Sequence, residues 1–376
     1  MKQKTYTLVV ALNLLGTIVG AGVFGLPEVF ARTGILGGSL LFFAVLVLAI
    51  LLHLLFTDVV LNVPGKHRIP GYVGVVLGRK MYWIAGLSVF LKISGTILAY
   101  IILGGEFLSM LSRNVFGEQI WIWSLIFWII GALIVFFGLK VVAVVESELT
   151  WLLIGFMLFS LLVLFPFVNW NLFGQMHANG LFNAFGVIFF SVMGISIMPD
   201  LVDLAHRKQS DSRKGIFLGT LLAGILSWLF GIFIAGVYPN IHSVRDIQLV
   251  FPPIFWWLIP AIGLLAVITS YITMAQALKL TLHIDLKLGS IAAWIITILF
   301  PFLLYVFVSR DLLTTLGFVG GVLTAFVALL LCICAYKVFN SSKTKYKFNP
   351  VWRQVPLVLS LALILLLFVH FYTHYL

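Results

Sequence analysis

Eleven apolar stretches, each long enough to cross a bilayer, divide this sequence. A helix rises about 1.5 Å per residue, so roughly 20 apolar residues span the hydrocarbon core. Only helices and closed barrels satisfy their backbone groups there, and stretches of this length indicate helices. The predicted spans are about 6–31, 37–61, 81–111, 120–139, 149–168, 181–204, 215–237, 254–282, 289–308, 312–339 and 355–372. Because 62% of the residues are hydrophobic and 9% charged, we predict an all-α polytopic membrane protein rather than a soluble domain.

The basic residues predict the topology. Placing the N-terminus in the cytoplasm puts most of the 23 lysines and arginines on the inner side, as the positive-inside rule requires. An odd number of spans then leaves the C-terminus outside. The net charge of +11 is therefore explained without nucleic acid. Met1 to Lys4 lead directly into the first span without a small-residue cleavage site, so we expect no cleaved signal peptide.

The first span contains the stretch Gly16-Thr17-Ile18-Val19-Gly20-Ala21-Gly22-Val23-Phe24-Gly25-Leu26-Pro27-Glu28. Four glycines and a proline interrupt the helix where hydrocarbon tolerates irregular backbone least. One interpretation is a broken helix whose unpaired peptide groups are offered to a ligand. The alternative is a close helix–helix contact through small residues.

A second copy of the pattern favours the broken helix. Gly22-x-x-x-x-Pro27-Glu28 is matched by Gly194-x-x-x-x-Pro199-Asp200 in the sixth span. Corresponding interrupted spans in two halves of a membrane chain indicate a transporter site near the bilayer midplane. A shift of five spans reverses direction across the membrane. We therefore predict one transmembrane domain over 1–376, with inverted repeats at 6–168 and 181–339 and an extra C-terminal helix at 355–372.

Four stretches resemble a known family. The run GTIVGAGVFGLPEVFARTGILGG is similar to the first span of the amino acid/auxin permease family, within the amino acid–polyamine–cation superfamily and its leucine-transporter fold. PGYVGVVLGRK, GTILAYIILGGEFL and FFSVMGISIMPDL resemble that family's loop before span three, its third span and its sixth span. The resemblance covers spans one to ten and implies amino acid transport.

A zwitterionic amino acid needs partners for both charged ends, and a broken helix offers them. Amides at the start of the second half-helix favour a carboxylate, and carbonyls at the end of the first favour an ammonium. The resemblance implies the same tasks for these segments. We expect amides of Gly20, Ala21 and Gly22 on the carboxylate, and carbonyls of Ile18, Phe190 and Ser191 on the ammonium.

The side-chain pocket is predicted from the sixth and third spans. Phe190, Met193 and Ile195, beside Gly194, would form an apolar pocket with Ser196 as its polar contact. Similarity to the fold's third-span tyrosine implies that Tyr100 donates a hydroxyl near the carboxylate, with ordinary packing as the alternative. No charged residue is clearly placed there, so we expect a neutral, apolar or aromatic L-amino acid.

The coupling ion is left open between sodium and a proton. The resemblance implies a sodium site formed by Ala266, Thr269 and Ser270 of span eight with the carbonyls of Gly16 and Val19. Oxygen ligands suit such a hard cation, although Thr-Ser pairs also bond neighbouring helices. The fold's other sodium site uses an asparagine where this chain has Val23, which argues against that site. No other cofactor is expected.

Lys92 offers a different coupling device. It lies within the third span, where a lysine costs at least about 2.5 kcal/mol and usually has a partner and a purpose. It either titrates and couples proton movement, replaces a cation as a fixed charge, or bonds helix carbonyls as a structural residue.

Other polar residues have plainer interpretations. Glu28 and Asp200 each follow a proline at a helix start, where an acid favours the dipole; gating is the alternative. Cys332 and Cys334 do not share a helix face, so neither a disulfide nor a metal site is expected. His370 and His374 are expected at the membrane interface rather than on a metal.

These observations predict a secondary active amino acid transporter in the cell membrane, surrounded by lipid, that works by alternating access. The alternative from another class is a nutrient sensor that binds an amino acid with little flux. An enzyme is not expected, because the HExxH and GxSxG motifs and paired intramembrane aspartates are missing. The sequence does not specify the oligomeric state.

Overall fold

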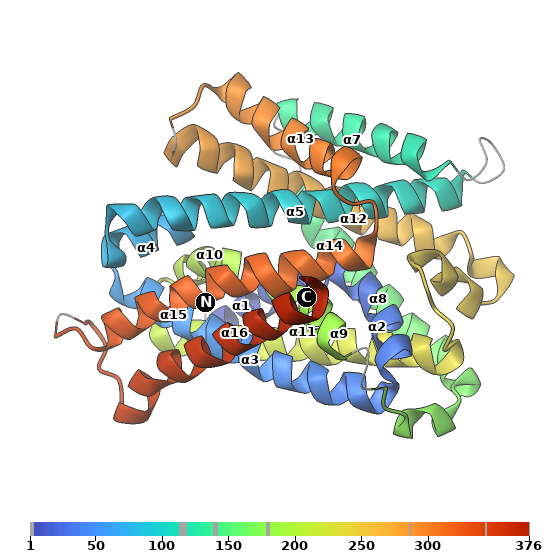
Figure 1. The fold of residues 1–376 in the computed structure, drawn as a ribbon, viewed down its shortest axis with the longest axis horizontal. Coiled ribbons are helices and arrows are strands. Elements are labelled where there is room, and N and C mark those ends of the chain that lie inside the picture. Colours follow the sequence, from blue (N-terminus) through green and yellow to red (C-terminus); the bar gives the residue numbers. More distant parts are fainter. Residues whose placement is uncertain are drawn as a thin grey trace.

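The computed structural model describes residues 4–112, 119–137, 142–177, 181–285, 287–342 and 344–375. Within these ranges the regular structure is helical throughout (Figure 1). The longer helices are α1 (Lys4–Ile18), α2 (Leu26–Thr33), α3 (Ile35–Asn62), α4 (Ile69–Leu77), α5 (Arg79–Leu111), α7 (Ile120–Phe137), α8 (Val142–Leu164), α9 (Leu181–Val192), α10 (Met198–Leu204), α11 (Gln209–Val237), α12 (Leu258–Leu280), α13 (Ser290–Phe307), α14 (Leu312–Phe318), α15 (Ala325–Phe339) and α16 (Pro350–Tyr375).

Most predicted spans have helices of membrane length. Nine described helices, or runs of helix such as Ala184–Leu204, are long and apolar enough to cross a membrane, and the pair Tyr6–Ile18 and Ala21–Thr33 adds a tenth as one bent span. The predicted span 149–168 corresponds to a shorter apolar helix, Trp151–Phe167. The count of eleven therefore stays a prediction for this segment, as does the division into inverted repeats at 6–168 and 181–339.

The helices form two groups around the site. In the upper part of Figure 1, α5, α7, α12 and α13 pack against one another. Below them, α1, α2, α3 and α9 pack together with α11. Small residues allow the close approaches that drive helix association in lipid. At one such crossing Gly186 of α9 meets the backbone at Gly317, where an added Cβ would overlap the carbonyl oxygen.

The first span is broken, as its glycines predict. Helix α1 ends at Ile18, a short 3-10 turn η1 (Ala21–Gly25) follows, and α2 continues at an angle of 48°. Pro27 lies in the first turn of α2, where its missing N–H removes no helical hydrogen bond. The interruption therefore arises from glycine-rich backbone followed by a proline that starts a new helix.

The sixth span is broken in the same way. Helix α9 ends at Val192, η5 (Ile195–Ile197) forms one 3-10 turn, and α10 begins with Pro199 in its first turn. The two breaks touch, because a Cβ added to Gly22 would lie 2.8 Å from the Cα of Ser191. Backbone contact of this kind is what glycine permits.

The tenth predicted span, 312–339, contains an irregularity that the sequence analysis missed. Between α14 and α15 the chain forms a π-helical turn, η9 (Val319–Thr324). Such turns are rare and frequent at functional sites. Its Gly320 packs directly against the backbone of Gly186 in α9, and η9 also contacts α5.

Candidate functional site

A cavity of about 60 Å³ lies between the two breaks and the helices that face them. Its lining comes from the first span, α5, the sixth span, α12 and η9. The lining residues are Thr17, Ile18, Gly20, Ala21, Gly22, Lys92, Ile93, Thr96, Tyr100, Phe190, Met193, Gly194, Ser196, Ile197, Met274 and Thr324.

Most of the predicted substrate residues share this cavity. They are Ile18, Gly20, Ala21, Gly22, Tyr100, Phe190, Met193, Gly194 and Ser196. Ser191 and Ile195 lie outside its lining. Ser191 is buried and its Oγ donates to the carbonyl of Ile188 at 2.8 Å, while the Ile195 side chain is packed in the core.

Lys92 corrects an expectation about charge. No charged residue was expected in the pocket, but Lys92 lines it, and its Nζ donates to Ser196 Oγ at 3.0 Å. Lys92, Thr96 and Tyr100 are spaced by four residues on α5 and so occupy one helix face. An ammonium group at this position disfavours binding of a cationic ligand and favours binding of a ligand carboxylate. It is also able to contact the face of an aromatic ligand.

Three threonines in the lining were missed. Thr17 Oγ1 donates to the Asn13 carbonyl at 3.0 Å, Thr96 Oγ1 to Lys92 at 2.9 Å, and Thr324 Oγ1 to Val319 at 2.8 Å. Each hydroxyl hydrogen is thus used within its own helix, which leaves oxygen lone pairs to accept from a ligand. Polar residues inside apolar spans were the available signal. The lining also includes Ile93, Ile197 and Met274, which are apolar and therefore do not stand out within an apolar span.

The candidate sodium ligands lie beside the cavity rather than in its lining. A Cβ added to Gly20 would lie 3.8 Å from Ser270 Oγ, so α12 faces the first break at this point. Thr269 Oγ1 donates to the carbonyls of Leu265 at 3.1 Å and Ala266 at 3.0 Å, and its lone pairs remain available to a cation.

The other two predicted ligands belong to the first span. Gly16 lies in α1, and Val19 still donates its amide to Leu15 at 2.9 Å, directly before the break. That Gly16, Val19, Ala266, Thr269 and Ser270 bind sodium stays a prediction. Within the described ranges no cluster of His, Cys, Asp or Glu suits a metal ion.

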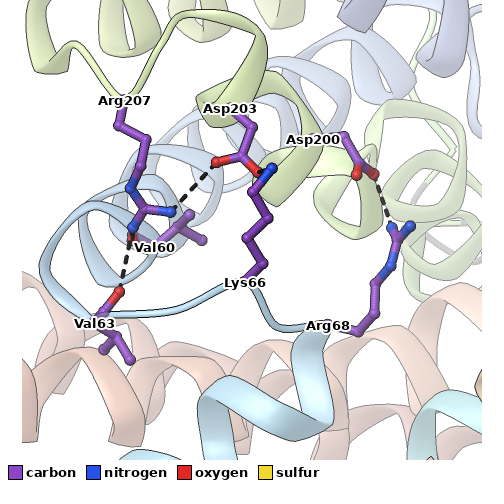
Figure 2. Close-up of polar contacts among 7 residues, drawn as sticks. All are labelled: Val60, Val63, Lys66, Arg68, Asp200, Asp203 and Arg207. Atoms are coloured by element: carbon purple, nitrogen blue, oxygen red, sulfur yellow. Dashed lines mark hydrogen bonds and ion pairs between the residues drawn. The ribbon is translucent and has the colours of Figure 1, made fainter. Parts of the chain in front are cut away.

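The acids that follow the two prolines have different partners. Glu28 is 7% exposed and accepts from Arg32, one turn later in α2, at 2.5 Å. Asp200 is exposed and pairs at 2.8 Å with Arg68, which precedes α4 (Figure 2). The ion pair of Glu28 is thus formed within helix α2, whereas the ion pair of Asp200 links α10 to the segment that precedes α4.

The end of α10 is tied to the end of α3. Asp203 pairs with Lys66 at 3.0 Å and with Arg207 at 3.3 Å, and Arg207 also donates to the carbonyls of Val60 and Val63 (Figure 2). These carbonyls are among the acceptors that a helix C-terminus leaves unpaired. Arg207 has a positive φ of 53°, a conformation that costs roughly 1–2 kcal/mol in a non-glycine residue. Its contacts with Asp203, Val60 and Val63 offset that cost.

Two other predictions concern cysteines and histidines. Cys332 and Cys334 are both buried free thiols, and the expectation that they form neither a disulfide nor a metal site stays a prediction. The side chains of His370 and His374 lie outside the described residues.

Sequence and structure comparisons group this chain with amino acid transporters. The family described as "Tryptophan/tyrosine permease family" matches residues 3–374. "Glutamine transporter 2" of Aliivibrio fischeri (strain ATCC 700601 / ES114) is 21% identical over 350 residues, which is 89% of each chain. A crystal structure of MhsT in complex with L-phenylalanine has a TM-score of 0.67 at 14% identity and covers 100% of this chain and 99% of its own. The last likeness concerns the fold.

Proposed function

The chain belongs to the tryptophan/tyrosine permease family, and from this premise we propose that it moves neutral L-amino acids across the membrane by secondary active transport. Family membership makes the chain an amino acid permease and an integral membrane protein rather than an enzyme. It also replaces the amino acid/auxin permease family suggested by the sequence motifs. The observation that carries the proposal is the cavity at which both helix breaks meet.

The cavity chemistry supports binding of a zwitterion. Amides of Gly20, Ala21 and Gly22, together with the Lys92 ammonium, suit the carboxylate. Carbonyls at the ends of α1 and α9 and the threonine hydroxyls suit the substrate ammonium. Tyr100 contributes its ring and hydroxyl to the same wall. Two ends of opposite charge are thereby recognised without a carboxylate side chain in the lining.

We propose aromatic amino acids as the first substrates to test and glutamine as the second. Phe190, Met193, Ile197 and Met274 give the cavity an apolar part. The Lys92 ammonium at the same cavity can form a cation–π contact with the aromatic ring of a bound substrate. The family description favours tryptophan and tyrosine, whereas the 21% identical relative is named as a glutamine transporter. Ser196 and Lys92 provide hydrogen-bond donors for an amide side chain.

We propose that transport proceeds by alternating access, which the two broken spans support. The half-helices α2 and α10 can move against α1 and α9 because the intervening turns lack continuous helical hydrogen bonds. We propose that the N-terminus is cytoplasmic and that the network in Figure 2 lies on the cytoplasmic side. Coupling to sodium at the Ser270 side or to protons at Lys92 remains for experiment.

The test is uptake of radiolabelled amino acids into proteoliposomes. The panel contains tryptophan, tyrosine, phenylalanine, glutamine and lysine, with an imposed sodium gradient and then a proton gradient at constant sodium. We expect gradient-driven uptake of neutral substrates and exclusion of lysine. If uptake is driven by sodium and the double variant Thr269→Val with Ser270→Ala loses it, these two residues belong to the sodium site. Binding without uptake under either gradient would contradict transport and favour a sensor.

A further inference from the structure

His53 is a buried polar residue that neither the sequence motifs nor the proposed transport cycle uses. It lies in the C-terminal half of α3, a 28-residue apolar helix, and is 0% exposed. An intramembrane histidine of this kind usually has a specific partner. Here it has two, one on each ring nitrogen and each on a different span.

The first partner is the second helix break. The backbone N–H of Gly194 donates to His53 Nε2 at 3.0 Å. In a continuous helix this amide would donate to the carbonyl of Phe190, but that carbonyl faces the amide of Met193 at 3.4 Å instead. His53 therefore replaces the helical acceptor that the break removes.

The second partner fixes the tautomer. His53 Nδ1 lies 2.9 Å from Thr220 Oγ1 of α11, and that hydroxyl donates its hydrogen to the Ile216 carbonyl at 2.9 Å. An amide N–H can only donate, so Nε2 must carry a lone pair and Nδ1 must carry the hydrogen. The neutral Nδ1–H form satisfies every donor in this chain, from Gly194 through His53 and Thr220 to Ile216.

We infer that His53 is a positioning residue of the transport site, because it holds the Gly194 peptide where the second break faces the cavity. The inference rests on the proposed function. Met193, Gly194 and Ser196 line the cavity, and Gly194 packs tightly on the first span, since an added Cβ would lie 2.8 Å from Leu14 Cδ1. An unpaired amide inside a membrane protein is costly, so loss of the His53 acceptor should let this segment rearrange.

Two amide side chains separate the roles of the two ring nitrogens. Glutamine places its oxygen near the position of Nε2 and can accept from Gly194, whereas asparagine reaches only the position of Nδ1 and Thr220. His53→Gln should therefore keep the KM for substrate within about threefold of the wild type. His53→Asn should raise it about tenfold, as expected for a buried donor left without an acceptor.

Thr220→Val is the matched structural control. It leaves the Nδ1–H of His53 unpaired in the same buried surroundings but retains the bond to Gly194. We expect both His53→Asn and Thr220→Val to lower the thermal stability, and only His53→Asn to raise KM. Equal KM values for His53→Asn and wild type, or an equal rise in Thr220→Val, would overturn the inference.

Amide hydrogen exchange tests the inference independently of transport. In nanodiscs, peptides covering 189–198 should exchange faster in His53→Asn than in wild type, His53→Gln or Thr220→Val. Unchanged exchange in His53→Asn would overturn the inference. If the wild type takes up no amino acid, the proposed function fails, and the exchange result alone decides whether His53 orders the break.

Discussion

The two helix breaks look alike in sequence but are stabilised differently. The first is shaped by glycine, because Gly22 allows η1 to press against the backbone of Ser191. The second is stabilised by side chains of neighbouring helices. His53 on α3 accepts a hydrogen bond from the Gly194 amide, and Lys92 on α5 donates one to the Ser196 hydroxyl. The same motif thus yields one break set by backbone shape and one set by side chains of neighbouring helices.

This difference indicates how the site can be rearranged. Side-chain hydrogen bonds can be exchanged for bonds to a ligand, whereas backbone packing at glycine has no such alternative. We therefore expect the first break to tolerate little change in volume and the second to respond to changes in hydrogen bonding. Four tests follow, from the largest expected effect to the smallest.

Gly22→Ala should have the largest effect. The added Cβ would lie 2.8 Å from the Cα of Ser191. Relieving this overlap requires the backbone of one of the two segments to move. Overpacking costs roughly 1–3 kcal/mol and occasionally more, and contact with backbone places this site at the upper end, so we expect uptake to fall at least about 100-fold. Gly86→Ala in α5 is the control, because Gly86 lies outside the cavity lining and nothing lies within 4 Å of its added Cβ. Equal uptake by the two variants would contradict a first break set by packing.

Lys92→Met should follow. The methionine keeps an unbranched side chain but removes the charge and the bond to Ser196. A hydrogen bond from a charged group contributes about 1.5–3 kcal/mol, which corresponds to a loss of roughly 10- to 100-fold in uptake at low substrate concentration. Ser196→Ala removes the bond alone and should cost less. Wild-type uptake and ion dependence in Lys92→Met would make this lysine structural.

Arg207→Lys should lower stability more than transport. A lysine cannot reproduce the forked contacts with Asp203 and the carbonyls of Val60 and Val63. We expect the free energy of unfolding to fall by about 1–3 kcal/mol, measured by thermal unfolding in detergent. The KM of the variant should match the wild type. A KM change with unaltered stability would instead connect this network to the second break.

The two acids after the prolines should give the smallest effects, in a fixed order. Glu28→Gln weakens the bond to Arg32 at a buried position of the first break and should cost about 1 kcal/mol. Asp200→Asn breaks an exposed pair whose side chains are 58% and 56% accessible, and should cost less than about 1 kcal/mol. Salt should reduce only the second effect. Thermal unfolding at two ionic strengths measures both, and the reverse order would contradict this assignment.

The sequence predicts the helical fold and both breaks, because glycine and proline act locally within long apolar stretches. It places nine of its eleven substrate residues around one cavity, although their binding role stays a prediction. His53 was missed because its partners, Gly194 and Thr220, lie 141 and 167 residues away. An isolated histidine in an apolar span was the available signal. The exposure of Lys92 to the cavity depends on how α5 is rotated, which local sequence does not determine.

The most direct test of the central claim is whether substrate occupies the cavity between the breaks. A cysteine at Thr96→Cys would be labelled with a thiol reagent in proteoliposomes, with and without a saturating transported amino acid. Asn340→Cys, exposed at the end of α15, is the control, and the native Cys332 and Cys334 are buried. We predict that substrate slows labelling at position 96 at least about tenfold and leaves position 340 unchanged. Unchanged labelling at position 96 under conditions of active uptake would contradict the account.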